Sequence, residues 1–129
     1  MRLLLDTHVW LWMVVAPDRL SAVARRLVTS EHHELLLSAA STWEIAIKHG
    51  LKKLTMPGDP ELLVPEWMAR TGVTPLPVLH RHTLHVGSLP IHHADPFDRL
   101  LVAQAQLEEL TILTADRNLA RYEVEVKLA

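Results

Sequence analysis

Short runs of apolar residues alternate along the chain with longer segments in which apolar residues recur every three or four positions. The short runs have the length and the continuous apolar character of strands that are buried on both faces. The longer segments have the period of helices with one apolar face. Strands that alternate with helices are typical of βα units, so the pattern predicts an α/β fold with a mainly parallel sheet.

The predicted strands are rich in Leu, Ile and Val. Pro75 and Pro77 place one of them at a sheet edge, because proline cannot donate a hydrogen bond to a neighbouring strand. The last strand alternates apolar and charged residues, as a half-exposed strand does. The predicted strands are Arg2–Asp6, Glu34–Ser38, Val73–Val78, Thr111–Asp116 and Glu123–Ala129.

The predicted helices begin at residues that can cap a helix N-terminus, and several end near glycine or proline. Asp95 followed by Pro96 is the clearest start, an N-cap with a proline at the first helical position. Pro65 lies inside one segment, where a proline disfavours a helix. The predicted helices are Thr7–Ala16, Ser21–Glu31, Ser41–Gly50, Glu61–Gly72 and Phe97–Glu109, with a helical turn at Arg117–Tyr122.

Length and composition narrow the class of protein. A chain of 129 residues with 49% hydrophobic content predicts one domain over residues 1–129. No apolar run is long enough for a membrane span, and Asp6 interrupts the N-terminal apolar stretch, so we expect a cytoplasmic protein without membrane contact. The absence of cysteine excludes disulfides, thiolate zinc sites and cysteine nucleophiles. The formal net charge of −2 indicates no broad basic surface for nucleic acid.

Four acidic residues fall where strands end or helices begin. Asp6 and Asp116 end predicted strands, and Glu44 and Asp98 lie in the first turns of predicted helices. Because parallel strands direct their carboxyl ends to one edge of a sheet, these four side chains can converge. Mg²⁺ prefers such oxygen ligands, and a carboxylate-bound cation suits the chemistry of phosphodiesters.

Each acid also has a purely structural interpretation. Glu44 completes a capping box with Ser41, Asp98 can favour a helix dipole, and Asp6 and Asp116 can each cap the helix that follows. Four acids at one sheet edge would, however, repel one another and raise their pKa values unless a cation neutralised them. Their coincidence therefore favours a metal site.

Four stretches of the chain occur in an order that is typical of one family. They are LLLDTHVWLW at Leu3–Trp12, SAASTWEIAIKHGLKKL at Ser38–Leu54, HHADPFDRLLVAQA at His92–Ala105 and LTADRNL at Leu113–Leu119. Together they resemble the signature blocks of the PIN-domain family, in particular of its VapC toxins, over nearly the whole chain. The resemblance implies a three-layer α/β/α sandwich with a central, mainly parallel sheet of four or five strands.

The same resemblance implies a function and its residues. Asp6, Glu44 and Asp98 match the acids that bind Mg²⁺ or Mn²⁺ in the family, and Asp116 matches the usual fourth acid. VapC toxins are endoribonucleases, so RNA is the implied substrate. The implied partners are a VapB-like antitoxin and a second copy of the chain in a homodimer.

Several alternatives stay open at this point. The DPFD motif offers Asp95 as well as Asp98, with Asp95 better suited to helix capping. The histidines allow a zinc site, either at His80, His82 and His85 or at His92 and His93 with Asp95, although HExxH and cysteine-paired patterns are absent. A catalytically silent binding module and a non-toxin RNA-processing nuclease would keep the same fold.

Basic and aromatic residues also flank the predicted site. The four tryptophans sit within helical patterns, which favours core or interface positions over base stacking. Some lysines and arginines can contact phosphates or form an ordinary solvated face. These are Lys48, Lys52, Lys53, Arg99, Arg117 and Arg121.

Overall fold

A computed structural model describes residues 1–129, and its centre is a five-stranded sheet in the order β3-β2-β1-β4-β5. Every pair of neighbouring strands is parallel, and β3 lies at an edge, as its prolines predict. The mainly parallel sheet expected from the sequence is therefore confirmed. The strands are β1 (Arg2–Leu5), β2 (Glu34–Ser38), β3 (Thr74–Leu76), β4 (Thr111–Thr114) and β5 (Val126–Leu128).

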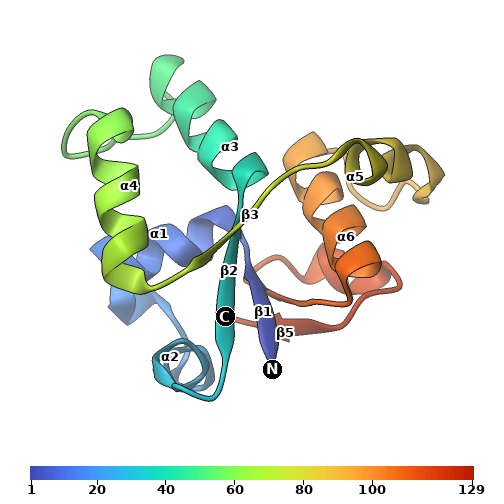
Figure 1. The fold of residues 1–129 in the computed structure, drawn as a ribbon, viewed down its shortest axis with the longest axis horizontal. Helices are drawn as coiled ribbons and strands as arrows, with labels where there is room; N and C mark the ends of the chain where they lie inside the picture. Colours follow the sequence, from blue (N-terminus) through green and yellow to red (C-terminus); the bar gives the residue numbers. More distant parts are fainter.

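Helices cover both faces of this sheet. Figure 1 shows α1, α2 and α4 on one side and α5 and α6 on the other. The α-helices are α1 (Thr7–Val15), α2 (Ala22–Thr29), α3 (Ala39–Gly50), α4 (Pro60–Thr71), α5 (His80–His85) and α6 (Pro96–Glu108). Short 3₁₀ turns are η1 (Pro17–Arg19), η2 (Val86–Ser88) and η3 (Arg117–Arg121). No helix has both the length and the apolar content needed to cross a bilayer.

Strand β1 shows why the sheet needs two covered faces. Leu3 and Leu5 belong to one buried cluster, while Leu4 belongs to the other, and all three side chains are fully buried. Successive side chains of a strand point to opposite faces, so a continuous apolar run fills both cores at once. The expected three-layer α/β/α arrangement is therefore confirmed.

Helix α3 begins earlier than the sequence predicts, and α4 forms as predicted despite its proline. Helix α3 begins at Ala39 instead of Ser41, because the Ser38 hydroxyl accepts a hydrogen bond from the Ala40 amide and caps the helix earlier. Helix α4 continues through Pro65, whose side chain is exposed. Packing of the buried Val64 and Trp67 holds that helix despite its proline.

Helix α5 lies in a segment for which the sequence predicts no element. Its one buried residue is His82, whose Nδ1 accepts a hydrogen bond from the Leu79 amide at 2.9 Å. The other ring nitrogen lies 2.8 Å from Glu108 Oε1 at the end of α6. This short helix is thus fixed by polar contacts, so it lacks the apolar period from which a helix is predicted.

A buried glutamine of α6 joins the start of α3 to the edge strand. Gln104 is fully buried, and its Oε1 accepts a hydrogen bond from Ser38 Oγ at 2.5 Å. Its Nε2 donates to the Pro77 carbonyl at 3.1 Å. The serine that caps α3 is therefore held by α6, which fixes where the first turns of α3 stand relative to the sheet.

We expect Gln104→Leu to lower the free energy of unfolding by about 1–3 kcal/mol, because the Pro77 carbonyl and the Ser38 hydroxyl lose a buried partner. The matched control is Gln106→Leu in the same helix, where water can replace the lost contacts. Urea denaturation of both variants measures the difference. Equal losses for the two variants would contradict the role given to Gln104.

Candidate active site

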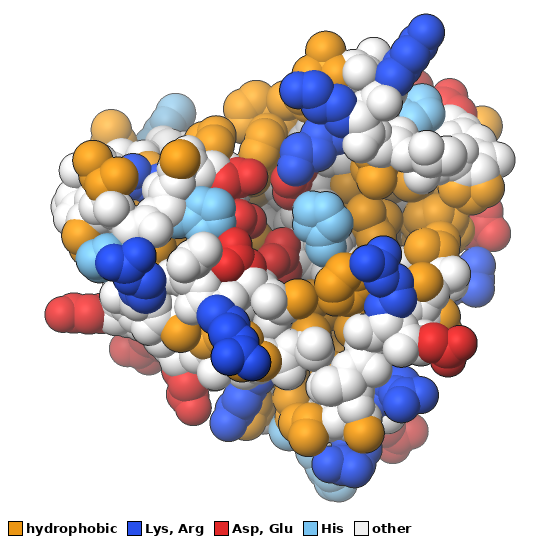
Figure 2. Space-filling view, turned by 180° about the vertical axis from the view of Figure 1, so that it is seen from behind, with side chains coloured by type: hydrophobic (Ala, Val, Ile, Leu, Met, Phe, Trp, Pro, Cys, Tyr) orange, Lys and Arg blue, Asp and Glu red, His pale blue; other side chains and the backbone are white.

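A pocket of about 370 Å³ lies at the carboxyl ends of the central strands and brings all four predicted acids together. Figure 2 shows acidic side chains gathered in a hollow on this face, between histidine side chains. The residues that line the pocket are Asp6, His8, Trp12, Glu44, His93, Asp95, Asp98, Ala115 and Asp116.

Asp6 directly follows β1 and is 5% exposed. It occupies the N-cap position of α1, but its side chain makes no capping hydrogen bond, so the capping interpretation is wrong. Its Oδ2 accepts a hydrogen bond from Thr114 Oγ1 at 2.5 Å, and its Oδ1 is buried without a partner. Burial raises the pKa of Asp6, the nearby Glu44 adds to the shift, and the Thr114 hydrogen bond opposes it.

Glu44 lies in the second turn of α3 and is 3% exposed. The capping box with Ser41 is wrong, because α3 already starts at Ala39 and Ser41 instead accepts a hydrogen bond from Thr7. One carboxylate oxygen of Glu44 pairs with Lys48, while Oε1 is buried without a partner. Burial would lower the pKa of Lys48, but the pairing with Glu44 outweighs it and raises that pKa.

The two aspartates of the DPFD motif have different surroundings. Asp95 Oδ1 accepts hydrogen bonds from the amides of Phe97 at 2.8 Å and Asp98 at 3.2 Å, so its predicted role as the N-cap of α6 is confirmed. The Asp98 carboxylate takes no part in this cap. Burial, followed by the negative charge of Asp6 and of the other acids in the pocket, raises the pKa of Asp98 to about 8.

Asp116 follows β4 by two residues and combines a structural contact with a site contact. Its Oδ1 caps η3 by accepting a hydrogen bond from the Asn118 amide at 2.9 Å, which confirms the capping interpretation. Its Oδ2 lies 2.7 Å from His93 Nε2. Burial acts to raise the pKa of Asp116, but the hydrogen bonds from Asn118 and His93 outweigh it and lower that pKa.

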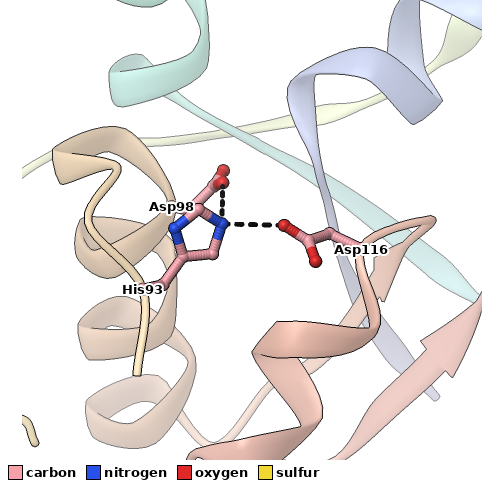
Figure 3. A group of neighbouring side chains, drawn as sticks. All are labelled: His93, Asp98 and Asp116. Atoms are coloured by element: carbon pink, nitrogen blue, oxygen red, sulfur yellow. Dashed lines mark hydrogen bonds and ion pairs between the residues drawn. The ribbon is translucent and has the colours of Figure 1, made fainter. Parts of the chain in front are cut away.

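His93 lies between Asp98 and Asp116, as Figure 3 shows. Its Nδ1 accepts a hydrogen bond from the Asp95 amide at 3.1 Å, so the ring proton is assigned to Nε2. That proton faces Asp116 Oδ2 at 2.7 Å and Asp98 Oδ2 at 3.2 Å. His93 therefore holds two acids together through a hydrogen-bond donor, and its Nε2 lone pair is not offered to a metal.

The structure separates the histidines that the sequence offered as a zinc site. His82 contacts Glu108, and His85 contacts Gln106. His92 packs edge to face against Tyr122. Of these histidines, only His93 forms a group with two acids, and the ligand atoms of His93, Asp98 and Asp116 lie within 4.8 Å of one another. The HHADP sequence offered His93 as a ligand partner of Asp95, whereas its side chain reaches Asp98 and Asp116.

The donor set fits a hard divalent cation. Asp6 Oδ1 and Glu44 Oε1 are buried anionic oxygens without a hydrogen-bond donor, and leaving such atoms unpaired is costly. Both residues line the same pocket as Asp98 and Asp116. Mg²⁺ is typically held by a few carboxylates together with water and phosphate oxygens, which matches the residues present.

The sequence from residue 3 to residue 125 matches the family model of the PIN domain. The chain belongs to the PIN-domain family. Over 61 residues it is 48% identical to Ribonuclease VapC16 of Mycobacterium tuberculosis, and this alignment covers 47% of the chain and 43% of that relative. The match thus spans less than half of the relative's own length.

Solved structures share the fold of this chain. VapBC2 of Rickettsia felis, bound to a DNA fragment from its promoter, superposes with a TM-score of 0.74 and 13% identity, covering 100% of this chain and 99% of that chain. DNA-bound VapBC of Salmonella typhimurium superposes with a TM-score of 0.71 and 15% identity, covering 99% of this chain and 98% of that chain. At these identities the likeness concerns the fold alone.

Two basic residues of this PIN domain already have partners inside the molecule. Lys48 pairs with Glu44. The Arg99 guanidinium donates to the carbonyls of Val86 at 3.1 Å and Leu89 at 3.3 Å, where it closes the end of η2. Arg99 of α6 therefore has a structural role, because it holds the loop that leads to His93.

In chelator, we expect the free energy of unfolding to fall as the pH rises from about 4 to about 8. With its pKa raised to about 8, Asp98 retains a proton in the folded chain that the unfolded chain has lost, so folding is favoured at the lower pH. Asp98→Asn should remove much of this fall, on the order of a few kcal/mol.

Urea denaturation of wild type, Asp98→Asn and the control Asp95→Asn at both ends of this range measures the effect. Asp95→Asn should keep most of the fall of the wild type, because burial of Asp98 and the charge of Asp6 raise the pKa of Asp98 more than the charge of Asp95 does. A fall of the same size in Asp98→Asn would show that Asp98 is not the titrating group.

Proposed function

We propose that this protein is an endoribonuclease that depends on Mg²⁺ or Mn²⁺, and that it acts as a VapC-like toxin. The observation that supports this most is the pair of unpartnered, buried carboxylate oxygens of Asp6 and Glu44 in one pocket with Asp98 and Asp116. The similarity to a protein named Ribonuclease VapC16 supports RNA as the substrate.

Four acids and one histidine of the pocket each have a part in this proposal. Asp6, Glu44 and Asp98 hold the cation, with Asp116 as the fourth acid. His93 keeps the carboxylates of Asp98 and Asp116 at a fixed separation by donating to both. When bound, the cation offsets the charge that develops on a phosphodiester and lowers the pKa of a coordinated water.

The raised pKa of Asp98 couples cation binding to proton release. In the metal-free chain Asp98 carries a proton up to a pH of about 8, which reduces the repulsion among the four acids. A ligand carboxylate must lose this proton before it can bind a cation. Affinity for Mg²⁺ therefore rises with pH over the range in which Asp98 titrates.

We expect cleavage of RNA by the purified chain in Mg²⁺, its loss in excess chelator, and its return when Mg²⁺ or Mn²⁺ is restored. Asp98→Asn should lower the cleavage rate at least about 100-fold, because a charged oxygen at the cation is replaced by a neutral one. Asp95→Asn is the matched control, three residues away, and should cleave nearly as wild type because asparagine caps a helix about as well.

Gel analysis of a labelled RNA gives the rates for all three chains. Cleavage that persists unchanged in chelator would refute the metal mechanism. An inactive Asp95→Asn beside a nearly active Asp98→Asn would reverse the roles of the two aspartates.

The proposed partners follow from the same function. We propose that a VapB-like antitoxin covers the acidic pocket with a C-terminal segment that carries a basic side chain, and that the chain forms a homodimer. The structural neighbours named above are VapBC complexes, which supports a partner of this kind. The net charge of the pocket favours a lysine or arginine from the partner.

Expression of the chain without a partner should therefore arrest growth of a bacterial host, while expression of Asp6→Asn should not, because the cation site loses one carboxylate. Colony counts after induction, with immunoblots to equalise protein levels, measure the difference. Growth arrest of equal strength with both chains would show that toxicity does not depend on the acidic pocket.

A further inference from the structure

A second, apolar pocket of about 200 Å³ adjoins the acidic pocket. His8 and Trp12 of α1 line both pockets, so they form a shared wall. The apolar pocket is lined by α1, by α4 and by the loop that joins α3 to α4. A molecule that fills it therefore lies directly beside the four acids.

The lining of this pocket combines an apolar floor with a few polar groups at its margin. Leu11 and Trp67 are buried residues of the core, and Leu54 and Met56 pack against the same core. Thr55 adds a hydroxyl. Such a lining suits a flat, mostly apolar group that carries polar atoms at its edge.

Trp12 differs from the two core tryptophans. Trp10 and Trp67 are buried and stack edge to face at 6.3 Å, as expected for core residues. Trp12 packs against this core but remains partly exposed, and its ring forms part of the shared wall. The exposed Arg19 holds its guanidinium over the Trp12 ring, 4.7 Å from the ring centroid. An aromatic ring with a cation over it is thus available at the edge of the acidic pocket.

We propose that the apolar pocket binds one unpaired base of the RNA, next to the phosphate that enters the acidic pocket. This inference rests on the proposed nuclease function. Unpaired bases stack on aromatic and guanidinium planes, whereas bases inside a duplex cannot reach such a pocket. A nucleotide joins an apolar base to an anionic phosphate within one unit, which matches an apolar pocket next to a cation site and an exposed arginine.

An apolar side chain of a protein partner is a different occupant. It would use the floor of the pocket but would leave the guanidinium over Trp12 without a role. The guanidinium favours the nucleotide, because it offers a plane for a base and a positive charge for a phosphate.

The test compares two probes that share backbone length and charge, a short oligoadenylate and an oligonucleotide of the same length without bases. Fluorescence anisotropy in Mg²⁺ gives their dissociation constants, with Asp6→Asn as the background to prevent cleavage. In this background we expect the oligoadenylate to bind roughly 5- to 150-fold more tightly, the contribution of one base stacked on an aromatic ring.

The preference for bases should depend on the Trp12 ring. Trp12→Leu keeps the site apolar but removes the stacking plane, so the ratio of the two dissociation constants should fall close to one. Trp12→Phe keeps an aromatic plane and should retain most of the preference. Trp43→Leu is the matched control, since Trp43 is 58% exposed, stacks on Phe97 and lines neither pocket. Thermal melts establish that each variant is folded.

Equal affinities for the two probes would overturn the proposal even without a variant, as would an unchanged ratio in a folded Trp12→Leu. Either result would instead favour an apolar side chain of a protein partner as the occupant of the pocket. These outcomes are distinct from failure of the nuclease function. A chain that cleaves RNA but has no preference for bases loses only this inference, and a preference for bases at Trp12 without cleavage would retain the subsite and refute the nuclease.

Discussion

Repulsion among four carboxylates in one partly buried pocket is the constraint on which the rest of the structure depends. Three of the acids each receive a close hydrogen bond, from a threonine, a lysine and a histidine. Asp98 has only a longer contact with His93, and its pKa is the one that rises to about 8. The donors do not fully offset the negative charge, which leaves the pocket suited to a cation.

The sequence predicted the features that depend on local pattern. The parallel sheet, the cap at Asp95 and the convergence of acids at strand ends follow from apolar runs and capping residues. The start of α3 was misplaced because Ser41 and Glu44 fit a capping box, whereas the helix is capped by Ser38, which is itself held by Gln104, 66 residues away. Such contacts between distant segments leave no local signal.

The same reason explains three features of the molecule that the sequence did not predict. Helix α5 has no apolar period, because His82 secures it through polar contacts with α6. The position of His93 depends on Asp116, which lies 23 residues further along the chain. Trp12 belongs to a helical pattern like the other tryptophans, and only the folded structure distinguishes a ring in the core from a ring at its border.

The hydrogen bond between Thr114 and Asp6 joins residues that are 108 positions apart. Because β1 lies between β2 and β4, it pairs with a strand close in the sequence on one side, whereas Asp116 joins the pocket only when the distant β4 pairs on the other side. A partly folded chain that has not formed this long-range pairing therefore holds an incomplete set of acids. The site is therefore lost as soon as β4 separates from β1, even where the pairing of β1 with β2 remains.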